Sequence, residues 1–217
     1  GVERIDLYYL HRREAARPVE EAMEALLRLR DEGKIGAIGL SEVAPATLER
    51  ACAVGPVAAV QSEYSLWSRQ VELGMTDACA RHGAALVAFS PLGRGVFRDA
   101  PPDPAGFAPG DLRTTMPRFQ PDNWARNLPR LRAFGDWARD RGECPAAVAI
   151  AWVLSRAPHV IALPGSRSVD HWRQIARGAA LRLDAEALDQ IERLLPAGWA
   201  HGPRYEQAMA LGPEGWS

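Results

Sequence analysis

The sequence has a single lysine, three cysteines, no long hydrophobic run and no excess of either charge. Lys34 is the only lysine among 217 residues, and the formal net charge is −1. Nucleic acids and anionic membranes attract strongly basic surfaces, so this charge balance indicates neither partner. No apolar run approaches the roughly 20 residues of a membrane-spanning helix, and the first residues do not resemble a signal peptide. We therefore expect no nucleic-acid partner and no membrane partner.

The three cysteines are too few and too far apart for a disulfide framework or a zinc site. Cys52, Cys79 and Cys144 are odd in number and have none of the close spacings of metal ligands. Isolated cysteines of this kind are typical of proteins kept in a reducing compartment. We therefore expect reduced thiols, a cytoplasmic location and no bound metal.

The composition is that of an ordinary globular domain. Hydrophobic residues make up 47% of the chain and charged residues 24%, both near the average for folded proteins. A chain of 217 residues is long enough to bury a sizeable core. No change of composition marks a linker, so we expect a single domain over residues 1–217.

Short apolar runs alternate with stretches of helical spacing along the whole chain. The runs predict strands at 5–10, 35–40, 57–61, 86–89 and 160–163. The spacing between them predicts helices at 19–29, 45–54, 71–82, 127–141, 145–156, 169–175 and 185–195. Strict alternation is typical of an α/β fold with a parallel sheet, either open or closed into a barrel. No strand is followed by the glycine fingerprint of a dinucleotide-binding open sheet, which favours the barrel.

Two segments do not fit the alternation. Residues 98–123 are rich in proline, glycine and aspartate and have no period, so we interpret them as a functional loop or lid. The tail from Gly198 carries Trp199, Tyr205 and Trp216. These aromatic residues predict a tail that docks on the rest of the protein.

Polar side chains follow each predicted strand, at the end where ligands bind in parallel α/β folds. They are His11 and Arg12, then Ser41 and Glu42, then Gln61, Glu63 and Tyr64, then Phe89, Ser90 and Arg94, and finally Gly165, Ser166 and Arg167. Arginines beside small residues suit a phosphorylated ligand, although solvated surface arginines are the alternative. The pattern predicts a pocket for a phosphorylated aromatic cofactor.

Six short motifs, spread over almost the whole chain, carry a family resemblance. They are Asp6-Leu7-Tyr8-Tyr9-Leu10-His11-Arg12, Glu32-Gly33-Lys34-Ile35, Ile38-Gly39-Leu40-Ser41, Val60-Gln61-Ser62-Glu63-Tyr64-Ser65-Leu66-Trp67, Phe89-Ser90-Pro91-Leu92-Gly93-Arg94-Gly95 and Leu163-Pro164-Gly165-Ser166-Arg167. Their sequence and order resemble the aldo-keto reductases, and most of all the branch near the potassium-channel β subunits. The resemblance implies an eight-stranded (β/α) barrel that reduces aldehydes and ketones to alcohols with NADPH and without a metal.

The resemblance assigns roles around the nicotinamide end of the cofactor. His11 matches the catalytic histidine, which orients the substrate carbonyl by a hydrogen bond. Ser41 and Gln61 match the residues that hold the nicotinamide carboxamide, and Glu42 stands where the family often has asparagine. Phe89 matches an aromatic residue that stacks on the nicotinamide through its π face.

The resemblance also assigns residues to the phosphates and the adenine. The pyrophosphate-binding turn is matched by Ser90, Leu92 and Arg94. Arg167 matches a basic residue that pairs with the adenosine 2′-phosphate, and Gly165 and Ser166 are its neighbours. Gln174 stands where the family often has a glutamate that holds the adenine.

Three catalytic residues of the family have no match in this chain. The first three strands of the family carry an aspartate, the proton-donating tyrosine and a lysine, and this chain begins at what would be the fourth strand. Lys34 precedes a strand, so the roughly 3.3 Å rise per residue leaves it about 20 Å from the mouth. Tyr64 could face the mouth, but without a nearby cation its pKa stays near about 10.

We therefore expect a partial barrel, strands 4–8, with two open sheet edges through which the chain could self-associate. Three explanations remain open: a fragment of a complete reductase, which we favour; a truncated product; or a relative whose edges pair with another chain. Two functions remain open as well, an NADPH-dependent reductase and an NADP(H)-binding pseudoenzyme or regulatory subunit. A more distant alternative is an unrelated phosphate-binding α/β protein. In each reductase-like case we expect His11, Ser41, Gln61, Phe89 and Arg94 within one cavity.

Overall fold

The computed structural model describes residues 1–206 and 213–215 and shows one parallel sheet. Its strands are β1 (Ile5–Leu10), β2 (Ile35–Ser41), β3 (Ala59–Glu63), β4 (Ala85–Phe89) and β5 (Val160–Leu163). They pair in sequential order from β1 to β5, and every pair is parallel. The predicted α/β fold with five parallel strands is confirmed.

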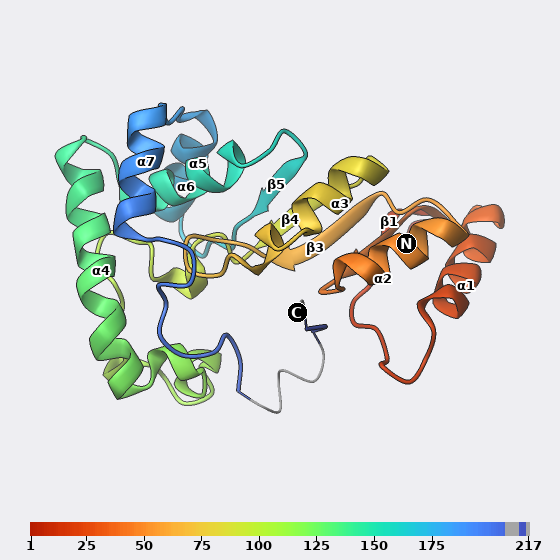
Figure 1. The fold of residues 1–217 in the computed structure, drawn as a ribbon, viewed down its shortest axis with the longest axis horizontal. Helices are drawn as coiled ribbons and strands as arrows, with labels where there is room; N and C mark the ends of the chain where they lie inside the picture. Colours follow the sequence, from red (N-terminus) through yellow and green to blue (C-terminus); the bar gives the residue numbers. More distant parts are fainter. Residues whose placement is uncertain (207–212, 216–217) are drawn as a thin grey trace.

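Helices follow the strands as the alternation predicts (Figure 1). They are α1 (Val19–Asp31), α2 (Pro45–Val54), α3 (Met75–His82), α4 (Pro121–Asp140), α5 (Pro145–Ser155), α6 (Val169–Ala180) and α7 (Ala185–Leu194). Figure 1 shows α1 and α4 at opposite ends of the long axis, with the sheet between them. No helix in the described part of the chain is long and apolar enough to cross a membrane.

Local sequence signals explain where the first helix begins and ends. Glutamates lie in the first turn of α1 and arginines in its last turn, so both ends complement the helix dipole. Val19, Met23 and Leu26 are buried at helical spacing. The chain leaves the helix at Gly33, whose φ of +75° is accessible to glycine at little cost.

Several predicted boundaries were wrong. Strand β3 begins at Ala59, two residues later than predicted, and ends at Glu63, two residues later than predicted, so Glu63 lies inside the strand. The segment 71–82 is interrupted at Gly74, whose φ of +115° separates a short 3-10 turn from α3. Helix α4 begins six residues before the predicted start, because Pro121 occupies its first position and Trp124 is buried on its core side. The predicted loop thus ends at 120 and contains short 3-10 turns.

The two faces of the sheet differ in how well they are covered. One face is buried against the helices, through Ile38, Leu40, Val60, Leu86, Ala88 and Val160. On the other face Ile161 and Leu163 are 53% and 48% exposed, and Gln61, Val87 and Phe89 are half-buried. In a closed barrel this second face is the interior, so the fold is a barrel wall with its inner side open.

Both edge strands carry exposed apolar side chains. Strand β1 pairs only with β2, and β5 pairs only with β4, among the residues that the structure describes. Ile5 and Tyr8 of β1 are 44% and 43% exposed, although large apolar residues of a parallel sheet are ordinarily buried. The two open edges predicted from the sequence are therefore present.

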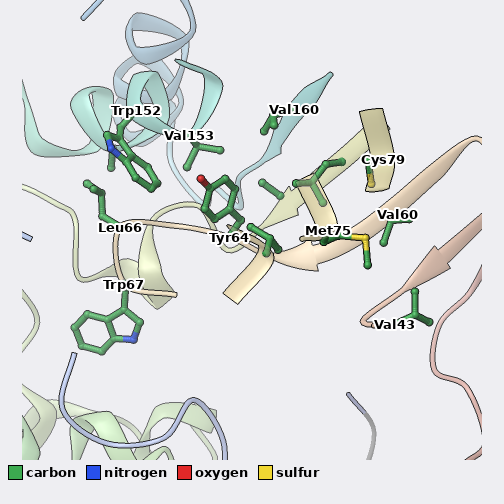
Figure 2. Packing of buried hydrophobic residues seen from close by; sticks show 14 of the residues in the cluster. Val43, Val60, Tyr64, Leu66, Trp67, Met75, Cys79, Trp152, Val153 and Val160 are labelled. Atoms are coloured by element: carbon green, nitrogen blue, oxygen red, sulfur yellow. The ribbon is translucent and has the colours of Figure 1, made fainter. Parts of the chain in front are cut away.

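Large aromatic residues fill the core on the helical side of the sheet. Tyr64 and Trp152 are both 1% exposed and meet edge to face, with ring centroids 5.5 Å apart. Figure 2 shows the Tyr64 ring beside Trp152 and Val153 of α5. Tyr64, expected from the sequence to be able to face the mouth, is thus a core residue.

The packing of α5 against α6 depends on the absence of a side chain at Gly178. A Cβ there would lie 2.6 Å from the Ala147 carbonyl oxygen and 2.7 Å from the Ile150 Cβ. We expect Gly178→Ala to lower the free energy of unfolding, because overpacking costs about 1–3 kcal/mol and outweighs the helix propensity gained. Urea denaturation would measure the change.

Gly135→Ala in α4 is the matched control. Its nearest neighbour would be the flexible end of Arg139, 3.2 Å away, so the stability should stay the same or rise by up to about 1 kcal/mol. Equal losses in the two variants would contradict the explanation from close α5–α6 packing.

Candidate functional site

A cavity of about 910 Å³ lies between the turn after β4, the loop before α4 and the start of α6. Six of the residues assigned from the sequence line it: Leu92, Arg94, Gly165, Ser166, Arg167 and Gln174. Arg98 and Arg113 also line it, whereas Asp111 is the only carboxylate among the described residues of its lining. A cavity of this size accommodates a drug-sized ligand, and its excess of arginines favours an anion.

The loop before α4 contributes side chains that the sequence motifs did not single out. The Asp111 carboxylate accepts hydrogen bonds from Nε and Nη2 of Arg113 at 3.0 and 2.6 Å. These bonds lower the pKa of Asp111 to about 2. Arg113 also donates to the Arg94 carbonyl at 3.3 Å, and its guanidinium lies 3.9 Å from the centre of the Phe107 ring. In the sequence, the composition of residues 98–123 signalled that this loop has a functional role.

The turn after β4 has an unusual backbone. Ser90 and Arg94 have φ of +51° and +60°, and Gly93 and Gly95 have φ of +56° and +87°. Left-handed conformations cost a non-glycine residue roughly 1–2 kcal/mol, so strain is concentrated where the strand ends. Such strain is typical of functional sites, where the surrounding structure holds it in place.

Arg94 is bound by protein groups on two sides. Its Nη2 donates to Glu63 Oε2 and to the Tyr205 hydroxyl, both at 2.9 Å. Its guanidinium carbon lies 5.5 Å from the centre of the Phe89 ring. Glu63 is 1% exposed and Phe89 is half-buried, so Arg94 joins a buried carboxylate to a partly exposed ring.

A second group of predicted residues lies at the carboxyl ends of β1 to β3. Arg12 Nη1 donates to Ser41 Oγ at 3.0 Å, and Ser41 is 3% exposed. His11 is exposed and Gln61 is half-buried. Burial raises the pKa of Tyr9, which lies in β1.

The 910 Å³ cavity does not unite the two groups. Its lining includes Arg94 but not His11, Ser41, Gln61 or Phe89. The expectation of one shared cavity is therefore met for Arg94 alone. The four residues differ in exposure: His11 is exposed, Gln61 and Phe89 are half-buried on the inner face of the sheet, and Ser41 is buried.

The Glu42 side chain, expected from the resemblance to lie at the cofactor site, is held by protein partners. Its side chain is 1% exposed, forms an ion pair with Arg204 and accepts a hydrogen bond from the Glu63 amide at 2.7 Å. A buried carboxylate needs such partners, because leaving it unpaired is costly. Glu42 thus ties the tail to the sheet, and its φ of +55° adds backbone strain there.

The tail docks over the carboxyl ends of the strands, as its aromatic residues predicted. Trp199 Nε1 donates to the Leu66 carbonyl at 2.6 Å, and Tyr205 is 8% exposed. The Glu214 carboxylate pairs with Arg13 and accepts from the Ala44 amide at 2.6 Å. Figure 1 shows the described end of the tail near α2. Trp216 lies outside the described residues.

None of the tyrosines near the site has an environment that favours proton donation. Burial raises the pKa of Tyr64, whose hydroxyl donates to Glu72 Oε1 at 2.8 Å. Burial also raises the pKa of Tyr205, and nearby Glu63 adds to the effect. Lys34 precedes β2, as expected, and pairs with Glu32 at 2.6 Å.

Comparisons with known proteins identify the family. The chain belongs to the aldo-keto reductases, because the model described as Aldo/keto reductase family matches residues 1–196. A protein of Glycine max named as an aldo-keto reductase is 37% identical over 208 residues, covering 96% of this chain and 60% of that protein. An aldo-keto reductase of Schizosaccharomyces pombe, whose name specifies NADP(+), is 34% identical, covering 94% and 61%.

Solved structures agree with the fold. A glycerol dehydrogenase from Gluconobacter oxydans is similar with a TM-score of 0.82 and 28% identity, over 95% of this chain and 62% of that one. An aldo-keto reductase from Klebsiella pneumoniae in complex with NADPH has a TM-score of 0.68 and 26% identity, over 94% and 63%. The chain spans about three fifths of the length of these relatives, so the fold is a partial barrel.

The ion pair between Glu42 and Arg204 generates a stability prediction. We expect Glu42→Ala to lower the free energy of unfolding by about 3 kcal/mol, because it leaves a largely buried guanidinium without its partner. Removing both charges with Glu42→Ala and Arg204→Ala should recover at least about 1 kcal/mol of that loss. Urea denaturation of the three proteins would measure this.

The exposed pair of Arg17 and Glu21 provides the control. Its atoms are 3.2 Å apart and both side chains are more than half exposed. Glu21→Ala should change the stability by less than about 1 kcal/mol. If Glu42→Ala lowered the free energy of unfolding by no more than Glu21→Ala does, burial would not increase the contribution of the Glu42–Arg204 pair to stability.

Proposed function

We propose that this chain provides the NADPH site and the carbonyl-orienting histidine of an NADPH-dependent aldo-keto reductase. The observation that carries the proposal is the arginine-rich cavity at the carboxyl end of β4 and β5, lined by Arg94, Arg98, Arg113 and Arg167. A dinucleotide with an additional phosphate is an anion that suits such a lining. The names of two relatives, one specifying NADP(+) and one a complex with NADPH, support it.

The proposal divides the cofactor between the two groups of residues. Arg167, with Ser166 and Gln174 beside it in the cavity, would hold the adenosine end and its 2′-phosphate. Ser41 and Gln61 would hold the nicotinamide carboxamide, next to Phe89 on the open face of the sheet. NADPH, when bound, supplies the hydride for carbonyl reduction.

The remaining chemistry is a proton for the carbonyl oxygen. His11 is exposed at the end of β1, where it would orient an aldehyde or ketone by a hydrogen bond. A proton donor is the missing element, since burial raises the pKa values of Tyr9, Tyr64 and Tyr205. We propose that small carbonyl compounds are the substrates and that the exposed edges at β1 and β5 drive self-association of the isolated chain.

The choice of cofactor can be tested at Arg167. We expect Arg167→Ala to weaken NADPH binding about 10- to 100-fold and to leave NADH binding nearly unchanged, because the charge-assisted bond to the 2′-phosphate is worth roughly 1.5–3 kcal/mol. Titration of the cofactor fluorescence would measure both affinities.

Arg173→Ala, in the first turns of the helix that follows Arg167, is the matched control. Arg173 is exposed, pairs with Asp170 at 3.0 Å and does not line the cavity. Removing the Arg173 side chain should change neither the NADPH affinity nor the NADH affinity. Equal losses of NADPH and NADH binding in Arg167→Ala would assign Arg167 a structural role, and an absence of NADPH binding by the unmodified chain would refute the proposed function.

Turnover can be tested on the chain of residues 1–217 itself. We expect NADPH oxidation with a reactive aromatic aldehyde or dione to be about 10²- to 10⁴-fold slower than with the Schizosaccharomyces pombe relative, because a positioned general acid contributes about that much. The open inner face should add to the loss by loosening the pocket. Turnover equal to that of the relative would show that His11 or a tyrosine of this chain donates the proton.

A further inference from the structure

The guanidinium of Arg94 has more protein partners than a free phosphate-binding group would have. By resemblance Arg94 belongs to the pyrophosphate-binding turn. In the structure its Nη2 is shared by Glu63 Oε2 and the Tyr205 hydroxyl, both at 2.9 Å. These two acceptors also lie 3.2 Å from one another, so the three groups form a closed triangle of hydrogen bonds.

Two members of this triangle are firmly buried. Glu63 is 1% exposed and Tyr205 is 8% exposed. The Glu63 carboxylate is also bound by the Ser68 hydroxyl at 2.8 Å. A buried carboxylate must be neutralised, so Glu63 requires the positive charge of Arg94. The Glu63 carboxylate therefore partly neutralises the charge that Arg94 could offer to a pyrophosphate.

The triangle places the Arg94 guanidinium next to the Phe89 ring. The guanidinium carbon lies 5.5 Å from the ring centre, within the range of a cation–π contact. Phe89 is the register partner of Glu63 in the sheet, so the carboxylate, the guanidinium and the ring come from adjacent positions. Phe89 stays half-buried, which leaves part of the ring free to contact a ligand.

We infer that Arg94 is a positioning residue, which holds the Phe89 ring in place for stacking on the nicotinamide, and that the tail takes part through Tyr205. The inference rests on the proposed function, because it assumes that NADPH binds with its nicotinamide on Phe89. It gives the C-terminal tail, 111 residues away from Arg94 in sequence, a direct effect on cofactor binding. If Arg94 were instead a ligand of the pyrophosphate, its removal would weaken the binding of every ligand that contains a pyrophosphate.

Two ligands separate these roles. NADPH contains the nicotinamide, whereas 2′-phospho-ADP-ribose keeps the adenosine, the 2′-phosphate and the pyrophosphate but lacks that ring. For Arg94→Ala we expect NADPH binding to weaken about 3- to 30-fold, the range of cation–π contacts. Binding of 2′-phospho-ADP-ribose should change less than twofold. Isothermal titration calorimetry on the full chain would measure both.

A milder variant tests the same inference while keeping the Arg94–Glu63 ion pair. Tyr205→Phe removes the hydroxyl that accepts from Arg94 and donates to Glu63, and we expect a loss of about two- to fivefold for NADPH and none for 2′-phospho-ADP-ribose. This variant decides the question if Arg94→Ala fails to fold. In the double variant Arg94→Ala with Phe89→Leu, the loss should not exceed that of Phe89→Leu alone, because the two residues act as one unit.

Each other outcome overturns the inference. Equal losses of both ligands in Arg94→Ala would make Arg94 a pyrophosphate ligand, and unchanged binding of both ligands in the two single variants would leave it no role in binding. If the unmodified protein bound 2′-phospho-ADP-ribose as tightly as NADPH, the nicotinamide would not stack on Phe89. The proposed site for the adenosine end would be unaffected by that result. Unmodified protein that binds neither ligand would refute the proposed function itself.

Discussion

Two carboxylates without access to solvent set the arrangement at the carboxyl end of this sheet. Glu42 and Glu63 follow or end neighbouring strands, and each is 1% exposed. A buried carboxylate is stable only when cations and hydrogen-bond donors surround it. The chain meets this demand from distant segments, with Arg94 of the turn after β4 and Arg204 of the tail. The position of that turn and the docking of the tail are thus consequences of one electrostatic requirement.

This arrangement explains why the inner face of the partial barrel is unevenly covered. Near the carboxyl ends of β2 and β3 the tail provides cover, so Ser41 and Glu63 are buried there. On β5 the same face has no cover, and Ile161 and Leu163 stay about half exposed. The residues that would hold the adenosine end lie in a cavity of their own. Of those proposed for the nicotinamide, Gln61 and Phe89 are half-buried and Ser41 is covered.

The strands and most helices could be predicted because their signals are local, such as the apolar run 86–89 and the proline before α1. Arg167 could be placed at a site because it follows the last predicted strand, and Gln174 through the family resemblance; the two do share a cavity. The roles of Glu42 and Arg94 could not be predicted, since their partners Arg204 and Tyr205 lie 162 and 111 residues away. Motif matching assigned both side chains to a ligand, and it gave no sign of the protein partners that each of them has in the structure.

The same long-range pairing has a consequence for the order in which this molecule folds. The partners of Glu42 and of Arg13 lie near the end of the chain, and the contact between Arg13 and Glu214 spans 201 residues. While a ribosome makes the protein, Glu42 has to stay hydrated until Arg204 emerges, even after β1 to β3 are complete. Contacts that close such long loops form late and slow folding. The carboxyl ends of the strands are therefore the last part of the protein to reach their folded arrangement, long after the strands themselves have been synthesised.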